Sequence, residues 1–215
     1  MEKTIDISID EITVTGDLHI PELARGIVVF AHGSGSSRHS TRNKHVARIL
    51  QEAGFATLLF DLLTVSEDQD PAARFDIALL TDRLIKVTDW LKSDIERADL
   101  VVGFFGASTG AAATLRAAAA LGSEIIRAVV SRGGRPDMAG RYFLAQVKSP
   151  TLVIVGGLDE QVADLNKEAF ATLTVEKQMR IIPGASHLFE EPGKLEEVAS
   201  LAVEWFNRHL VTLIE

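Results

Sequence analysis

The chain has 215 residues, no cysteine, and 30 acidic against 22 basic residues, which gives a net charge of −8. This is the length of one large domain, and we expect residues 1–215 to form a single one. The lack of cysteine excludes disulfides, thiolate metal sites and a cysteine nucleophile, while the negative charge opposes binding to nucleic acid or to an anionic membrane.

The N-terminal segment MEKTIDISIDE lacks the basic and apolar layout of a signal peptide. No apolar run approaches the ~20 residues that a membrane-spanning helix needs. We therefore expect a cytoplasmic protein.

The pattern of apolar residues along the chain predicts an α/β protein. KTIDISID and EITVTGDLHIP alternate apolar and polar residues, which is typical of two antiparallel strands with one solvated face. After them, apolar strand patterns alternate with helical ones, so we expect a mainly parallel sheet of seven or eight strands flanked by helices. The predicted strands are 26–33, 56–63, 100–108, 128–134, 151–159 and 178–184, and the predicted helices lie near 42–53, 75–93, 109–121, 161–172 and 193–210.

The strongest local motif is GASTG, residues 106–110, between an apolar strand and an alanine-rich helix. A serine at its centre, Ser108, would sit on a tight strand-to-helix turn that exposes its hydroxyl. A short-chain dehydrogenase is excluded because Tyr142, the only tyrosine, is followed four residues later by Gln146 where that family needs a lysine. A phosphate-binding P-loop is excluded because no lysine follows the second glycine. For the pentapeptide alone, a turn without chemistry stays open.

A serine nucleophile needs a histidine to take its proton and an acid to orient that histidine. Asp159 ends a predicted strand 51 residues after Ser108, and His187 follows the next strand 28 residues later. The order Ser, Asp, His is that of the α/β-hydrolases. Asp61, which also ends a strand, is the rival acid, and helix capping is the alternative role of Asp159.

A glycine-rich loop, residues 31–38, follows the first predicted parallel strand. The oxyanion of a tetrahedral intermediate needs two fixed N–H donors. We expect these to be the N–H groups of Thr109 and Ser34. We expect His32 to brace this loop rather than to transfer protons.

The segments HGSGSSR, GASTG, GGLDE and PGASHLFEEPG together resemble the α/β-hydrolase superfamily, in its small dienelactone-hydrolase-like branch. The resemblance implies an α/β-hydrolase fold with Ser108 as nucleophile, Asp159 as acid and His187 as base. Dienelactone hydrolases proper use a cysteine nucleophile, so we expect a substrate other than dienelactone. Many members of the superfamily carry a cap domain, but the 17-residue connection from Gly133 to Ser149 leaves no room for one.

These observations predict a serine hydrolase that cleaves a small-molecule carboxylic ester or lactone through an acyl-serine intermediate, with no metal or organic cofactor. The same residues would serve a thioesterase, a peptidase or an acyltransferase. A catalytically silent binding protein with this fold is the alternative from another class. The oligomeric state is left open.

Arginines are frequent near the predicted site, in a chain that is acidic as a whole. Arg38 is the last residue of the glycine-rich loop and Arg42 follows it, while Arg132 lies near the end of the strand after the nucleophile helix and Arg135 follows that strand. We expect Arg38 and Arg132 to bind an anionic group of the substrate. Pairing of these arginines with nearby acids is the alternative.

Overall fold

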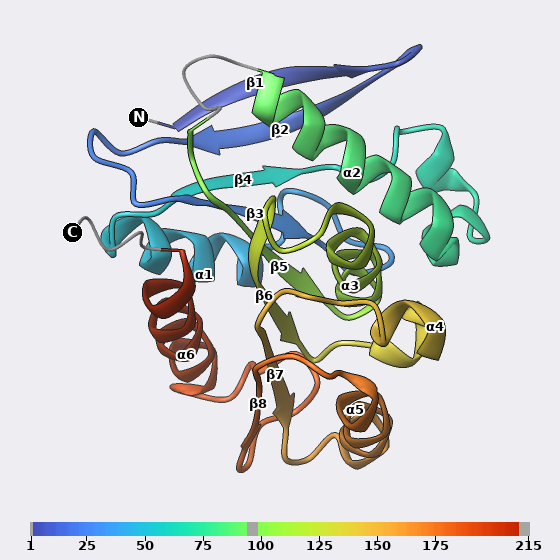
Figure 1. Ribbon diagram of the computed structural model, residues 1–215, viewed down its shortest axis with the longest axis vertical. Helices are drawn as coiled ribbons and strands as arrows, with labels where there is room; N and C mark the ends of the chain where they lie inside the picture. Colours follow the sequence, from blue (N-terminus) through green and yellow to red (C-terminus); the bar gives the residue numbers. More distant parts are fainter. Residues whose placement is uncertain (1, 94–98, 211–215) are drawn as a thin grey trace.

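The computed structural model describes residues 2–93 and 99–210, and the eight strands in this part of the chain form one sheet (Figure 1). The strand order is β1-β2-β4-β3-β5-β6-β7-β8. β1 pairs with β2 and β2 with β4 in antiparallel fashion, and every other pairing is parallel. The strands are β1 (Glu2–Ile9), β2 (Ile12–His19), β3 (Ile27–Ala31), β4 (Ala56–Phe60), β5 (Val102–Ala107), β6 (Ile126–Arg132), β7 (Thr151–Gly156) and β8 (Lys177–Ile182).

Helices cover both faces of the sheet. α1 and α6 pack together on one face, and α2, α3 and α5 lie on the other (Figure 1). Strands β3, β4, β5 and β7 are therefore buried along their whole length, as parallel strands between two helix layers are. The helices are α1 (Thr41–Glu52), α2 (Ile77–Ser93), α3 (Thr109–Leu121), α4 (Arg141–Leu144), α5 (Glu160–Thr172) and α6 (Lys194–His209), with short 3₁₀ turns at Glu67–Gln69, Ala73–Phe75 and Pro136–Ala139.

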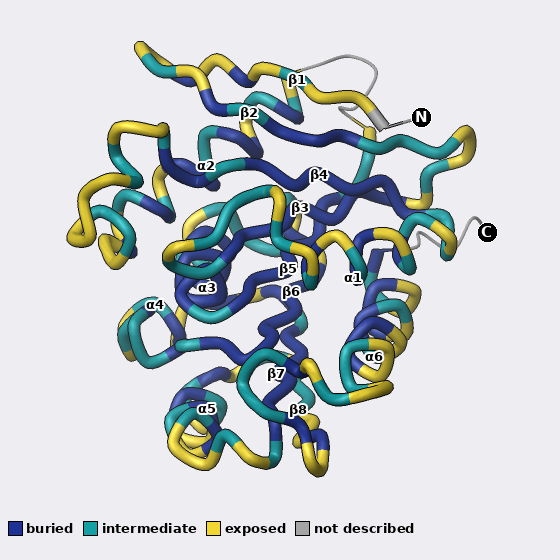
Figure 2. Tube along the Cα trace, turned by 180° about the vertical axis from the view of Figure 1, so that it is seen from behind, coloured by how far each residue is buried: buried dark blue, intermediate teal, exposed yellow. Residues whose placement is uncertain are grey.

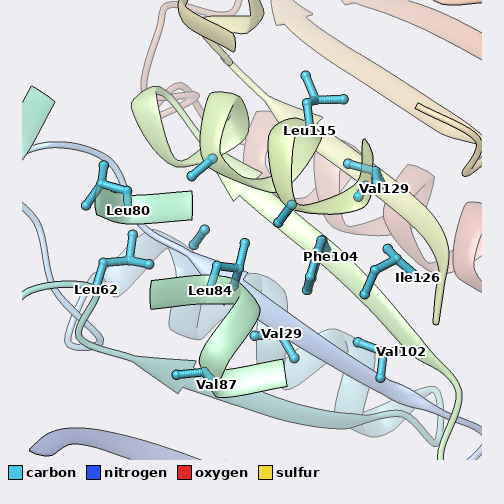
Figure 3. Close-up of a cluster of buried hydrophobic side chains, with 14 of the residues drawn as sticks. Val29, Leu62, Leu80, Leu84, Val87, Val102, Phe104, Leu115, Ile126 and Val129 are labelled. Carbon is cyan, nitrogen blue, oxygen red and sulfur yellow. The ribbon is translucent and has the colours of Figure 1, made fainter. Parts of the chain in front are cut away.

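The hydrophobic core is divided by the sheet into two layers. On one side, Leu84 and Val87 of α2 and Leu115 of α3 pack over Phe104 and Val129 of the central strands (Figure 3). On the other side, α1 and α6 bury a second cluster. Figure 2 shows the result as a buried centre with exposure concentrated in loops, outer helix faces and the β1–β2 hairpin.

The predicted fold class is confirmed. The predicted strands and helices match observed elements to within a few residues at each end, and the N-terminal pair is antiparallel as expected. The short helix α4 and the 3₁₀ turns are not among the predicted elements. The connection after β6 contains only a 3₁₀ turn and the four-residue α4, so there is no cap domain in this part of the described chain. Among the described residues, no helix has the length and apolar character needed to cross a bilayer.

Candidate active site

Ser108 lies on a strained turn between β5 and α3. Its backbone has φ 51° and ψ −122°, values that non-glycine residues rarely adopt. Three main-chain hydrogen bonds hold this conformation: the Ser108 N–H donates to the Arg132 carbonyl (3.2 Å), and the Ser108 carbonyl accepts from Ala111 (3.1 Å) and Arg135 (3.0 Å). Strain of this kind persists only where its surroundings enforce it, and it concentrates at functional sites.

The two glycines of the motif are required by close packing. A Cβ on Gly106 would lie 2.5 Å from the Ala111 Cα, and a Cβ on Gly110 would lie 2.3 Å from the Ala31 carbonyl oxygen. These glycines let α3 pack tightly on β5 and on the end of β3. The N-terminus of α3 is thereby fixed beside the glycine-rich loop.

Asp159 and His187 are joined at the carboxyl edge of the sheet. The His187 Nδ1–H donates to Asp159 Oδ2 at 2.6 Å, which leaves the Nε2 atom of the ring as the proton acceptor. Asp159 occupies the N-cap position of α5, but its side chain makes no capping hydrogen bond. The carboxylate is therefore used to hold the histidine, and not to cap the helix.

Ser108 and His187 line one cavity of about 270 Å³. Within the described part of the chain, the serine hydroxyl makes no hydrogen bond to the imidazole. In hydrolases without substrate this contact is often long, and it tightens when substrate binds.

The glycine-rich loop contacts the start of α3 directly. The Ser34 N–H donates to the Thr109 Oγ1 at 2.8 Å, so this donor already has an acceptor. The Thr109 N–H belongs to the first turn of α3, where N–H groups have no carbonyl partner within the helix. The two donors expected for an oxyanion therefore lie on segments that touch each other.

His32 braces the loop, as expected. Its buried ring accepts a hydrogen bond from the Leu62 N–H at Nε2 (3.1 Å) and lies 2.9 Å from the Gly33 carbonyl at Nδ1. Burial lowers the pKa of His32, so the ring is neutral at pH 7 and Nδ1 is the atom that carries its proton.

The two arginines expected at the site have different surroundings. Arg38 forms an ion pair with Asp61 and also lies 3.6 Å from Asp17, and it does not line the cavity of Ser108. This pairing occupies Asp61, whereas the carboxylate bound to His187 is that of Asp159. Arg132 does line the cavity, and its Nη2 donates to Asn43 Oδ1 at 3.3 Å.

Two contacts of the site are absent from the sequence-based prediction. The Ser186 N–H donates to Glu191 Oε2 (3.0 Å) and fixes the turn before His187. Asn43 is buried on α1 and lines the cavity. A polar residue on the apolar face formed by Val46, Ala47 and Leu50 could have signalled Asn43, but no local pattern signals the partner of Glu191.

Comparisons with known proteins add to this geometry. A family model described as the dienelactone hydrolase family matches residues 14–213. A crystal structure of a dienelactone hydrolase from Anabaena variabilis has a TM-score of 0.93 and 52% sequence identity, covering 97% of this chain and 98% of that chain. Est1E from Butyrivibrio proteoclasticus, at 17% identity and a TM-score of 0.82 over 97% of this chain and 99% of its own, shares the fold.

Two proteins from strains of Mycobacterium tuberculosis, named provisionally as phosphoribosyl transferases, are 56% identical to this chain over 209 residues. The match covers 97% of this chain and 47% of each relative. The chain therefore spans about half the length of these curated relatives.

Proposed function

The chain belongs to the dienelactone hydrolase family, and from this premise we propose that it is a serine hydrolase that cleaves a small carboxylic ester or lactone through an acyl-serine intermediate. One observation carries the proposal. A serine at a strained strand-to-helix turn shares a cavity with a histidine whose other ring nitrogen is held by a carboxylate.

In the first half of the reaction, the Ser108 Oγ attacks the carbonyl carbon while His187 Nε2 takes the hydroxyl proton. The tetrahedral intermediate then collapses, and the imidazolium gives that proton to the departing alkoxide. Asp159 keeps Nδ1 protonated and stabilises the imidazolium. In the second half, water attacks the acyl-serine with the same histidine as base, which releases the acid and restores Ser108.

The oxyanion of each intermediate would be held by the N–H groups of Thr109 and Ser34. The Ser34 N–H must then exchange or share its present acceptor, the neutral Thr109 hydroxyl. A charged oxygen forms the stronger hydrogen bond, so the exchange is favourable as negative charge develops. Stabilisation is therefore greatest in the transition state, where it accelerates the reaction.

The same acyl-enzyme could be formed from a thioester or a peptide, or could pass its acyl group to an acceptor other than water. In the part of the chain that the structure describes, no cap domain follows β6, so the cavity lies beneath short loops. This favours small or protruding substrates. The transferase name belongs to relatives about twice as long as this chain, and we propose hydrolysis for the shared part.

A fluorophosphonate probe tests the nucleophile. We expect covalent labelling at Ser108 alone, located by peptide mass spectrometry, and loss of labelling in Ser108→Ala. Turnover of 4-nitrophenyl acetate should fall on the order of 10⁶-fold in the variant, the cost of losing the nucleophile of a comparable triad. Labelling at Ser34 or Ser36, with an active Ser108→Ala variant, would overturn the assignment. An unlabelled and inactive wild-type chain would favour a silent binding protein.

A further inference from the structure

Arg132 is a buried cation without an acidic partner. The residue is 5% exposed at the end of β6, and among the described residues no carboxylate lies within 4 Å of its guanidinium. Its Nε has no acceptor, its Nη2 meets only the neutral Asn43, and the Phe189 ring lies 5.8 Å from its Cζ. Buried charges in proteins are ordinarily paired, so the cavity side of this guanidinium is a place for an anion.

A second guanidinium lies beside the first. Arg42 is close enough that its charge, together with the larger effect of burial, lowers the pKa of Arg132 to about 10. Arg132 thus stays charged at neutral pH, and the charge of Arg42 repels it. The carboxylate that faces Arg42 is Glu190, 2.8 Å away, whose side chain is 61% exposed and so is screened by water.

The N-terminus of α1 adds to the positive potential. Ser40 is the N-cap of this 12-residue helix, and Ser40, Arg42 and Asn43 all line the cavity. The first turn of a helix presents N–H groups and the positive end of the helix dipole. Three sources of positive potential therefore converge on one wall.

This wall is beside the nucleophile. Arg132 pairs in register with Ala107, and its carbonyl accepts the Ser108 N–H at 3.2 Å. Arg132, Arg42, Ser108 and His187 line the same cavity. A substrate whose ester lies on Ser108 can therefore place a second group against the two arginines.

We propose that the substrate carries an anionic oxygen group, a carboxylate or a phosphate, that binds Arg132 and Arg42 at the N-terminus of α1 while its ester lies on Ser108. The proposal rests on the proposed function of Ser108 for the position of the ester. Arg38 has no part in this site, because Asp61 and Asp17 already neutralise it.

The kinetic test compares 4-nitrophenyl hemisuccinate, which is anionic, with 4-nitrophenyl butyrate, which is neutral and of similar size. Arg132→Met should lower kcat/KM for the hemisuccinate at least ten-fold, and Arg42→Met should lower it several-fold, because each removes a charge-assisted hydrogen bond. Activity on the butyrate should change less than about two-fold. Arg48→Met, which removes an exposed arginine of α1 that pairs with Glu52 and does not line the cavity, should affect neither substrate. Equal losses on both substrates would overturn the proposal.

A binding test separates this proposal from the assignment of the nucleophile. Succinate and inorganic phosphate are titrated by calorimetry into Ser108→Ala, which needs no turnover. The probe that binds more tightly shows whether the site prefers a carboxylate or a phosphate. Its affinity should weaken at least ten-fold when Arg132→Met is combined with Ser108→Ala. Arg42→Met provides the same test if Arg132→Met does not fold. Failure of both probes to bind, or binding that neither arginine variant weakens, would overturn the anion site even if Ser108 is the nucleophile.

Discussion

At the scale of single residues, the candidate site contains backbone conformations that lower the stability of the fold. Ser108 has a positive φ in a conformation that costs of the order of 1–3 kcal/mol for a residue with a side chain. Phe189, two residues after His187, has φ 58°. Both sides of the site therefore contain backbone that the packing around them must enforce.

The strain at Ser108 can be measured by comparing two inactive variants. Ser108→Gly should be more stable than Ser108→Ala by about 1 kcal/mol, because glycine adopts this backbone conformation without a Cβ clash while losing more chain entropy on folding. For a chain of this size that is a Tm higher by roughly 2–4 °C. Scanning calorimetry on the two proteins gives the difference. An alanine variant as stable as the glycine variant would mean that the turn stores no strain.

The choice of acid is also a question about one residue. Asp159→Asn keeps the shape of the side chain but favours the wrong tautomer of His187, so turnover should fall by ~10⁴-fold. Asp61→Asn, which loosens the contact with Arg38, should change turnover only a few-fold. Steady-state kinetics on the same ester decide between them. A larger loss at Asp61 would make it the catalytic acid.

At the scale of elements, short loops at the carboxyl ends of the strands form the site, and side chains from the helices hold them in place. The loop after β4 is tied to α2 by Glu67, whose Oε2 accepts the Thr64 N–H (2.7 Å) and whose Oε1 accepts Arg83 Nη2 (2.8 Å). Arg83 is 5% exposed, so Glu67 neutralises a buried charge. This loop walls a second cavity, which shares Ser36 with the cavity of Ser108.

The tie between loop and helix makes stability depend on pH. Burial raises the pKa of Glu67, but hydrogen bonds from Thr64 and the charge of Arg83 outweigh it and leave the pKa below its usual value. A lowered pKa stabilises the fold at pH values above the unfolded pKa of about 4.3, and the contribution is lost as the pH falls through the folded pKa. Glu67→Gln should therefore lower stability by about 1–3 kcal/mol at pH 7.

The difference in Tm between wild type and Glu67→Gln should narrow as the pH is lowered below about 4. Thermal unfolding of both proteins at pH 7, 5 and 3.5 measures it. Glu204→Gln, at an exposed position of α6, is the matched control and should leave Tm nearly unchanged at pH 7. A constant gap between wild type and Glu67→Gln across this range would show that the ionisation of Glu67 does not contribute.

At the scale of the whole molecule, the sequence predicts those features that depend on residues close together in the chain. Buried strands are continuous apolar runs, and the turn at Ser108 needs the small residues Gly106 and Gly110, so both are visible in the order of residues. Side-chain pairing depends on segments far apart in the chain. Arg38 and Arg132 both lie at or just after the carboxyl end of a strand. The fold nevertheless places Asp61 and Asp17 beside Arg38, and no acid among the described residues pairs with Arg132.

The residues that stabilise the fold and those that form the candidate site lie in different parts of the molecule. Leu84 is fully buried in the layer between α2 and the sheet (Figure 3), whereas the candidate site lies at the carboxyl edge of the strands.

Leu84→Ala should lower the free energy of unfolding by about 2–5 kcal/mol, because it removes buried apolar surface and leaves a cavity. For a chain of this size the Tm should fall by roughly 4–20 °C. At 25 °C the folded fraction should keep the wild-type kcat and KM, since Leu84 does not line the cavity of Ser108. Denaturation curves and ester kinetics on the same preparation provide both numbers, and Leu23→Ala, at a side chain that is 87% exposed, should change neither. A large loss of kcat in folded Leu84→Ala protein would instead show that the helix layer positions the nucleophile.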